Sequence, residues 1–322
     1  MPQNDDTKAR LVEVDHVDQI NKRILFELDL NSRISYQELG DKIGISANAV
    51  KKRVTALIET GVIYEFVVQL KHRMAGASWV ITVITTDGNE DVSAFYDEID
   101  RHPAVTGIFP QVTKSYVLFS QCIGIQQVNE LSIHLRSVNH VKDTEMHIIG
   151  KDPLSEGRVV ELDRLQLRVL EALLDDARMP LVEISRKTGL SARRVRKVLD
   201  QLAENDNIHF AVFWNVNLGE GNFFLSRIQF DVRESSSTEV ETEFNDQYPH
   251  EYWYSYVSAT EPVMFSVFVV PHLREAQEIG EYLRKLRGVQ SVKNMVLYPA
   301  HIFKYPMQDA LRRIIREKLH GE

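Results

Sequence analysis

Residues 17–63 read VDQINKRILFELDLNSRISYQELGDKIGISANAVKKRVTALIETGVI, and residues 162–208 read LDRLQLRVLEALLDDARMPLVEISRKTGLSARRVRKVLDQLAENDNI. The two stretches align without a gap at a constant offset of 145. The identical pairs include Asp18/Asp163, Arg23/Arg168, Leu25/Leu170, Leu28/Leu173, Arg33/Arg178, Glu38/Glu183, Lys42/Lys187, Gly44/Gly189, Ser46/Ser191, Val50/Val195, Lys52/Lys197 and Leu57/Leu202. Such a run in one register identifies an internal duplication.

The duplication extends beyond this stretch. Residues 129–141 match residues 277–289 at an offset of 148, so a few residues were inserted between the two matching regions. Each half therefore spans about 140 residues, and the turn-rich stretch 150–157 joins the two halves.

The repeated stretch predicts three short helices. Apolar residues fall on one helical face after Asp18, and Ser35 with Glu38 forms a capping-box pattern at the start of a second helix. Gly44 suits the end of that helix and Ser46 the start of a third, which Gly61 ends. This order is typical of a helix-turn-helix module, and the extended residues 62–70 are the expected place for a wing.

A different pattern follows each module. In the first half, we expect strands near 78–86, 104–110, 115–123 and 141–149, with helices near 90–101 and 126–137. In the second half, the strands are expected near 222–232, 252–258, 263–270 and 289–298, and the helices near 238–247 and 273–286. This β-α-β-β-α-β order is ferredoxin-like.

The sequence thus predicts an α+β protein in which two winged helix-turn-helix domains alternate with two ferredoxin-like domains. The expected parts are a tail (1–16), winged helix-turn-helix 1 (17–70), ferredoxin-like domain 1 (71–150), a linker (151–161), winged helix-turn-helix 2 (162–217), ferredoxin-like domain 2 (218–300) and a C-terminal helix (301–322).

Basic residues cluster at the start of each third helix, the part that enters the major groove in helix-turn-helix proteins. Arginine there can contact phosphates or guanine edges. The candidate DNA-binding residues are Ser46, Asn48, Lys51, Lys52 and Thr55 in the first module and Ser191, Arg193, Arg194, Arg196 and Lys197 in the second. The second cluster is the more basic, so we expect the two modules to read DNA unequally, one of them mainly through phosphates.

Composition restricts the class of protein. Hydrophobic residues make up 43% and charged residues 26% of the 322 residues, as in globular proteins with packed cores. The net charge of −8 disfavours a generally basic nucleic-acid binder, so any DNA contact depends on local clusters of basic residues.

The single cysteine, Cys122, is expected to be buried and fits a reducing cytoplasm. No apolar run is long enough to cross a membrane, and the first residues are too polar for a signal peptide.

At these residues the chain resembles the Lrp/AsnC (leucine-responsive, feast/famine) regulators. The resemblance rests on the 17–63 pattern, including Arg33-Ile-Ser-Tyr-Gln-Glu-Leu39 and Gly44-Ile-Ser46, and on its second copy. It implies cytoplasmic regulators of transcription that bind double-stranded DNA, with ferredoxin-like domains that dimerise and often bind amino acids. Because one chain holds both units, we expect an internal pseudo-dimer, and a homodimer or higher oligomer through the same domains.

The loop that binds the effector in that family departs from the family pattern. The corresponding stretches, 111–116 and 258–263, lack the glycine and aspartate of the family. A small-molecule effector is therefore only a weak expectation, with Thr113, Ser115, Thr260 and Glu261 as its candidate residues. Ordinary turn chemistry accounts for the same residues.

The alternative from another class is an enzyme resembling the siroheme decarboxylases, which are built from the same two modules. It would use a large pocket lined by groups such as His147, His209, His250, His272 or His301, or by Tyr252, Tyr254 and Tyr256, which alternation places on one sheet face. No Ser/His/Asp, HExxH, P-loop or paired-cysteine signature occurs in the sequence. We therefore expect no enzyme, no catalytic or metal-binding residue and no cofactor.

Overall fold

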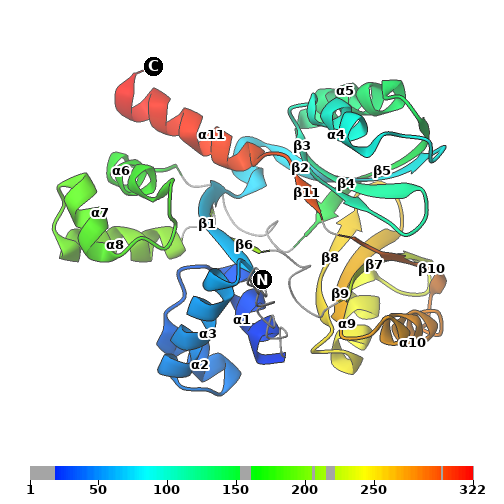
Figure 1. The fold of residues 1–322 in the computed structure, drawn as a ribbon, viewed down its shortest axis with the longest axis horizontal. Coiled ribbons are helices and arrows are strands. Elements are labelled where there is room, and N and C mark those ends of the chain that lie inside the picture. Colours follow the sequence, from blue (N-terminus) through cyan, green and yellow to red (C-terminus); the bar gives the residue numbers. More distant parts are fainter. Residues whose placement is uncertain (1–18, 153–160, 205–206, 215–221, 299, 322) are drawn as a thin grey trace, which may run out of the picture.

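In the computed structural model, the described residues are 19–152, 161–204, 207–214, 222–298 and 300–321. The expected N-terminal tail and most of the expected linker lie outside these ranges. Figure 1 shows the helix-turn-helix modules on one side, two α/β domains on the other and strands β1 and β6 between the modules. Among the described helices, none is long and apolar enough to cross a membrane.

The first helix-turn-helix module consists of α1 (Gln19–Leu30), α2 (Tyr36–Ile43) and α3 (Ala47–Glu59). The capping box predicted at Ser35 and Glu38 is present, and Gly44 ends α2 with a φ of 81°, in the left-handed region that favours glycine. The Ser46 hydroxyl accepts a hydrogen bond from the Ala49 amide and caps α3. The local signals in the sequence thus set the helix boundaries.

The second module repeats this arrangement with α6 (Arg164–Leu173), α7 (Leu181–Thr188) and α8 (Ala192–Ala203). Ser191 caps α8 as Ser46 caps α3. The apolar faces of each module form a separate core, centred on residues such as Leu28 and Val54 in the first and Leu173 and Val198 in the second.

Strand β1 (Ile63–Leu70) follows the first module and β6 (Ile208–Trp214) follows the second. The expected extended segment is present. It does not pair within its own module, because β1 pairs antiparallel with β6 of the other module. Phe66 faces Val212 and Val67 faces Ala211, which are equivalent pairs under the offset of 145. The ladder is therefore symmetric about a pseudo-two-fold axis, and the two modules are joined by backbone hydrogen bonds.

Both α/β domains have the predicted β-α-β-β-α-β order. The first contains β2 (Ala77–Thr86), α4 (Val92–Asp100), β3 (Val105–Pro110), β4 (Ser115–Ile123), α5 (Gly124–Ser137) and β5 (Val141–Lys151), preceded by a short 3-10 helix, η1 (His72–Ala75). The second contains β7 (Asn222–Phe230), α9 (Ser237–Gln247), β8 (Tyr252–Ser258), β9 (Val263–Val270), α10 (Leu273–Leu283) and β10 (Val289–Val296).

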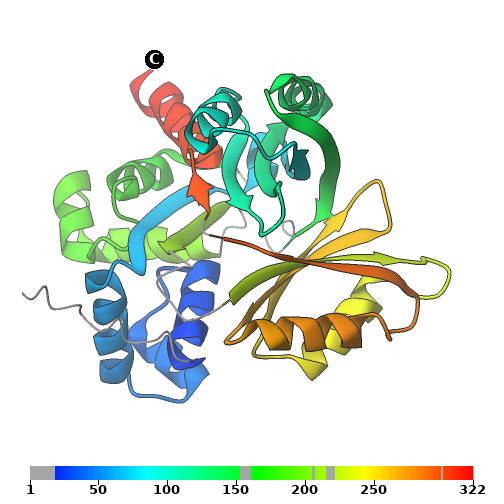
Figure 2. The ribbon, with the colours of Figure 1, turned by 45° about the vertical axis from the view of Figure 1, so that its right-hand side comes forward.

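The two sheets join into one sheet with the order β10-β7-β9-β8-β5-β2-β4-β3-β11. Their helix-free faces cover each other and form a shared core that includes Val117 and Phe265, while the helices lie outside (Figures 1 and 2). The end of β5 pairs with the end of β8, and Gln111 forms an equivalent bridge with Leu297 at the other end. The face expected to dimerise is thus filled within one chain.

The expectation that Tyr252, Tyr254 and Tyr256 share one sheet face is wrong. The register of β8 against β9 shifts between Tyr252 and Tyr254, so the alternation is interrupted there. Tyr252 packs in the helix-facing core of the second domain, whereas Tyr254 and Tyr256 lie in the core between the sheets.

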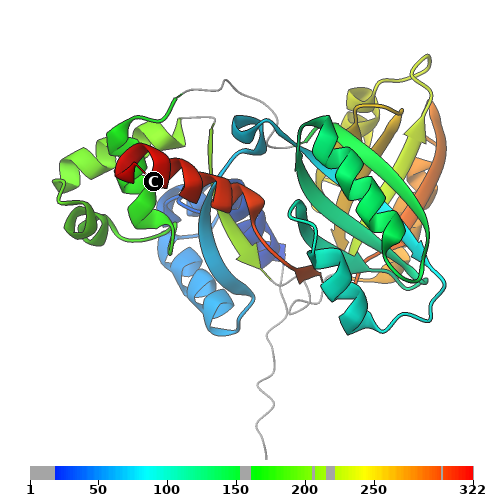
Figure 3. The ribbon, with the colours of Figure 1, turned by 90° about the horizontal axis from the view of Figure 1, so that it is seen from above.

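The two modules dock differently on the rest of the chain. In the first, the Lys22 ammonium donates to the Val269 carbonyl and Phe26 packs on Trp253, with ring centroids 6.0 Å apart. The second packs against the C-terminal helix α11 (Pro306–Ile315) and the π-helical turn that follows (Arg316–His320). Short strand β11 (His301–Ile302) leads to α11 from the edge of the first sheet (Figure 3).

Candidate functional site

The first recognition helix, α3, presents its predicted DNA-binding residues to solvent. Ser46, Asn48, Lys51, Lys52 and Thr55 are all exposed, and Val50 and Val54 on the opposite face are buried. Ser46 also serves as the N-cap, so its hydroxyl already has a backbone partner. The helix thus offers two lysines and two polar side chains near an N-terminus whose free amides favour anions.

The second recognition helix, α8, is more basic. Arg193, Arg194, Arg196 and Lys197 are exposed, and no ion pair holds their head groups within the described part of the chain. Ser191, also exposed, caps the helix. Uncommitted cations on the reading helix are suited to phosphate and guanine contacts.

Two equivalent arginines connect the modules beside the β1–β6 ladder. The Arg33 guanidinium donates to the carbonyls of Ala177 and Met179. The Arg178 guanidinium donates to the carbonyls of Ser32 and Ile34, the equivalent positions of the other half. Because the exchange is reciprocal, it holds α3 and α8 in a pseudo-symmetric arrangement.

The predicted effector residues lie in two turns, at separate places. Thr113 and Ser115 bond to each other, with their hydroxyl oxygens 3.0 Å apart. The Thr260 and Glu261 amides donate to the Ser258 hydroxyl. None of the four is among the residues that line the cavity described next.

Glu261 also belongs to a polar cluster around buried His147. A carboxylate oxygen of Glu261 lies 3.7 Å from Nδ1 of buried His147, and Nε2 of His147 lies 3.0 Å from Glu145. These three side chains could together hold a metal ion, but Arg227 already donates two hydrogen bonds to Glu145. The arginine supplies the positive charge that the carboxylate requires.

A cavity of about 610 Å³ lies where the first module, the β1–β6 ladder and the two sheets meet. All three tryptophans of the chain line it: Trp79, Trp214 and Trp253. Phe213 and Tyr305 stack on each other in its wall, with ring centroids 4.1 Å apart and ring planes 10° apart. The volume and the aromatic lining are those of a small-molecule site.

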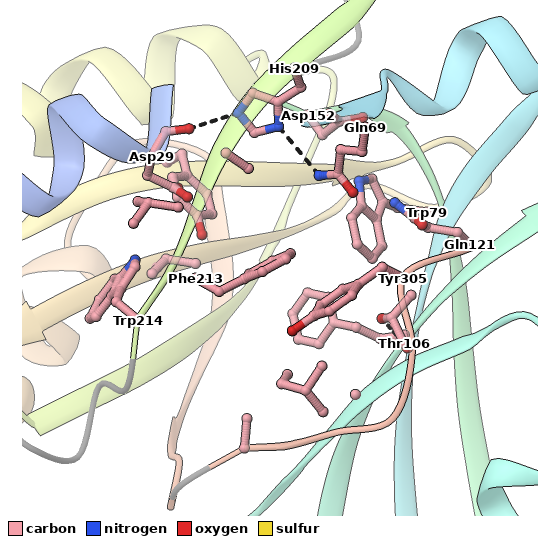
Figure 4. A pocket seen from close by; sticks show the side chains of 18 of the residues that line it. Asp29, Gln69, Trp79, Thr106, Gln121, Asp152, His209, Phe213, Trp214 and Tyr305 are labelled. Atoms are coloured by element: carbon pink, nitrogen blue, oxygen red, sulfur yellow. Dashed lines mark hydrogen bonds between the residues drawn. The ribbon is translucent and has the colours of Figure 1, made fainter. Parts of the chain in front are cut away.

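His209 and Asp29 lie next to each other at one end of the cavity (Figure 4). Nε2 of His209 donates to the Asp29 carbonyl at 2.7 Å, and Nδ1 faces the Gln69 amide at 3.4 Å. Burial lowers the pKa of His209 to about 4 and raises the pKa of the Asp29 carboxyl to about 7. His209 is therefore neutral at physiological pH, and Asp29 titrates within that range.

His209, Tyr254 and Tyr256, which the sequence offers as candidate pocket groups, all line this cavity. Asp29 and the three tryptophans line it as well and were not predicted. The repeat alignment held a signal for Asp29, because the equivalent residue is Leu174. A carboxylate at a position that is apolar in the other copy is not required by the helix-turn-helix fold.

Comparisons with known proteins match this architecture. A sequence profile described as winged helix-turn-helix DNA-binding matches residues 17–64 and 162–208. The chain is 26% identical over 145 residues to an HTH-type transcriptional regulator of Pyrococcus horikoshii, covering 44% of this chain and 89% of that protein. It is 28% identical over 135 residues to the HTH-type transcriptional regulator LrpC of Bacillus subtilis, covering 40% of this chain and 94% of that protein.

Among solved structures, the siroheme decarboxylase NirDL superimposes with a TM-score of 0.55 at 11% identity, covering 94% of this chain and 99% of that one. At this identity the likeness concerns the fold alone. The profile matches both repeated segments, and each of the two regulators matches a stretch as long as one half of this chain. The family comparisons therefore agree with the internal duplication. The chain belongs to the Lrp/AsnC-type family of helix-turn-helix proteins and carries two helix-turn-helix segments in tandem.

Proposed function

We propose that this protein is a sequence-specific DNA-binding transcription regulator whose two halves act as an internal pseudo-dimer. The observation that carries the proposal is the pair of exposed recognition helices, α3 and α8, held in a pseudo-symmetric arrangement by β1–β6 pairing and by Arg33 and Arg178. Two-fold-related readers bind half-sites about one helical turn, ~34 Å, apart. Because the exposed residues of α3 and α8 differ, we expect half-sites of unequal sequence.

In vitro selection of bound sequences from random duplexes, followed by fluorescence anisotropy on the selected sequence, tests this proposal. We expect one enriched composite site that requires both half-sites. A failure to enrich any sequence, with only weak binding that disappears at physiological salt, contradicts it. The matched control is the same selection with the four basic residues of α8 changed to alanine.

An enzyme related to the siroheme decarboxylases is the second candidate, because NirDL matches nearly the whole chain in fold and has also been solved with an iron-uroporphyrin III analogue. Such a macrocycle carries several carboxylates, so a site that binds it needs cationic side chains in its wall. Lys304, the lysine at the cavity wall, already binds the Asp100 carboxylate at 2.8 Å and two backbone carbonyls. The cavity chemistry therefore favours the regulator.

Absorption spectroscopy distinguishes the two candidates. We expect titration with siroheme or iron-uroporphyrin to leave the Soret band of the free macrocycle unchanged. A shifted Soret band at stoichiometric protein, followed by loss of carbon dioxide, would establish the enzyme instead.

A further inference from the structure

The charged groups around the cavity differ in how far they are already neutralised. The Lys304 ammonium is bound to Asp100 and to carbonyls outside the cavity, as described above. The Asp152 carboxylate is paired with buried His72, with Nε2 of His72 and a carboxylate oxygen 3.2 Å apart. His209 is neutral and both of its ring nitrogens have partners. None of these three groups has an uncommitted charge to offer a ligand.

Asp29 is the exception. Its carbonyl accepts the His209 hydrogen bond, but within the described ranges no hydrogen bond or ion pair reaches its carboxylate. Desolvation is the cause that raises its pKa, with no neighbouring cation opposing it. The ionisable groups that act on it are Tyr254 and Tyr256 on β8, and neutral His209 on β6 contacts its carbonyl. Asp152, which follows β5, lines the same cavity. Asp29 is partly buried, and its carboxylate lacks, among the described residues, the positive partner that buried charges normally have.

The fold does not impose this charge. The equivalent residue of the second module is Leu174, which follows the last residue of α6, whereas Asp29 lies in the last turn of α1. Its carbonyl accepts a hydrogen bond from the Gln308 amide, as the Asp29 carbonyl accepts one from His209. Leucine therefore also suits this position, and the helix-turn-helix fold does not require a carboxylate there.

The walls around this carboxylate are aromatic. Trp214 and Trp253 pack against each other with ring centroids 4.8 Å apart, and Trp79 packs edge-on against Tyr256 at 6.3 Å. Aromatic ring faces attract cations, most strongly in tryptophan and when water is excluded. Aromatic walls around one unpaired carboxylate match a ligand that combines a positive charge with an apolar body.

We propose that this cavity binds a small organic ammonium ion with an aromatic or other apolar body, with Asp29 as the counter-ion of the ammonium group. The cavity touches α1, both strands of the β1–β6 ladder and both sheets, so its occupant bridges the first reading module and the α/β core. This ligand binding does not depend on the proposed regulatory function.

The test uses three probes with the same body and different charge: 4-phenylbutylamine, 4-phenylbutanol and 4-phenylbutyrate. Binding to the full-length protein is followed by tryptophan fluorescence, because all three tryptophans line the cavity, and by calorimetry. We expect the amine to bind at least tenfold more tightly than the alcohol and the butyrate not to bind. The affinity for the amine should rise between pH 6 and pH 8 as Asp29 loses its proton.

Two variants connect the binding to Asp29. Asp29→Asn and Asp29→Leu, the second copying Leu174, should remove the preference for the amine over the alcohol. The control Asp246→Asn changes an exposed carboxylate on α9 and should leave all affinities unchanged. Thermal unfolding of each variant verifies that it is folded.

Several results overturn the proposal: no binding of the amine at 10 mM, equal binding of amine and alcohol, preferred binding of the butyrate, or an amine preference that survives both Asp29 variants. None of these experiments contains DNA. Their failure therefore leaves the proposed DNA-binding function untouched, and failure of the DNA selection leaves the ligand site untouched.

Discussion

Arg33 and Arg178 are equivalent residues of the two halves, and each donates hydrogen bonds to backbone carbonyls that flank the other. Each guanidinium also lies over aromatic rings: Arg178 is 4.6 Å from the Tyr36 ring centroid and Arg33 is 5.9 Å from that of Phe210. The two side chains thus fasten the loops after α1 and α6 to each other. A single chain reproduces here what a symmetric interface does between two subunits.

Replacement of either arginine should loosen the pair of modules. We expect Arg33→Ala and Arg178→Ala each to lower the free energy of unfolding by about 1–3 kcal/mol, because two carbonyls lose a charged donor. Urea denaturation of the single and double variants measures this. Since both bonds fix the same contact, the double variant should lose less than the sum of the singles. Strict additivity contradicts the coupling.

Alanine at Arg193, Arg194, Arg196 and Lys197 should weaken DNA binding and its dependence on salt. Each lost phosphate contact reduces the magnitude of the negative slope of log K against log salt by about 0.9. Anisotropy titrations at several salt concentrations measure both quantities. Lys51→Ala with Lys52→Ala should have a smaller effect, because α3 presents fewer cations. An unchanged slope in the fourfold variant would show that α8 does not contact DNA.

Asp29→Asn should stabilise the protein at neutral and alkaline pH. The pKa of this carboxyl is raised to about 7 by burial, whereas an unfolded aspartate titrates near 3.8. The folded state therefore binds its proton more tightly, and ionisation of Asp29 removes stability as pH rises from about 4 to 7. The variant lacks this loss, so its advantage should grow over that range to a few kcal/mol. Urea denaturation at pH 5, 6, 7 and 8 measures the difference, and a pH-independent difference contradicts it.

Cys122 should be unreactive in the native protein. It lies buried in the helix-facing core of the first α/β domain, and burial raises the pKa of its thiol to about 12. The reactive thiolate is therefore nearly absent at pH 8. Ellman's reagent should react with it only as denaturant unfolds the protein, so that the thiol reports unfolding. Rapid reaction in native buffer would contradict this burial.

Local signals were readable from the sequence because they act between near neighbours. The Ser35–Glu38 capping box and the left-handed Gly44 lie within a few residues of the groups they satisfy, and both are present. The strands 115–123, 252–258 and 263–270 have the predicted bounds. The bulge in β8 was not predictable, because it depends on the register with β9 and not on the alternation of tyrosines.

The sequence by itself determined the duplication, the two helix-turn-helix modules and the order of strands and helices, since periodicity and capping are written in short stretches of residues. Only the tertiary structure decided that β1 pairs with β6, that the two sheets cover each other, and that the first module docks on β9 and Trp253 while the second packs on α11. These outcomes depend on contacts between residues far apart in the chain. For the same reason, Asp29 and Leu174 occupy equivalent places in sequence, yet only Asp29 faces the aromatic cavity.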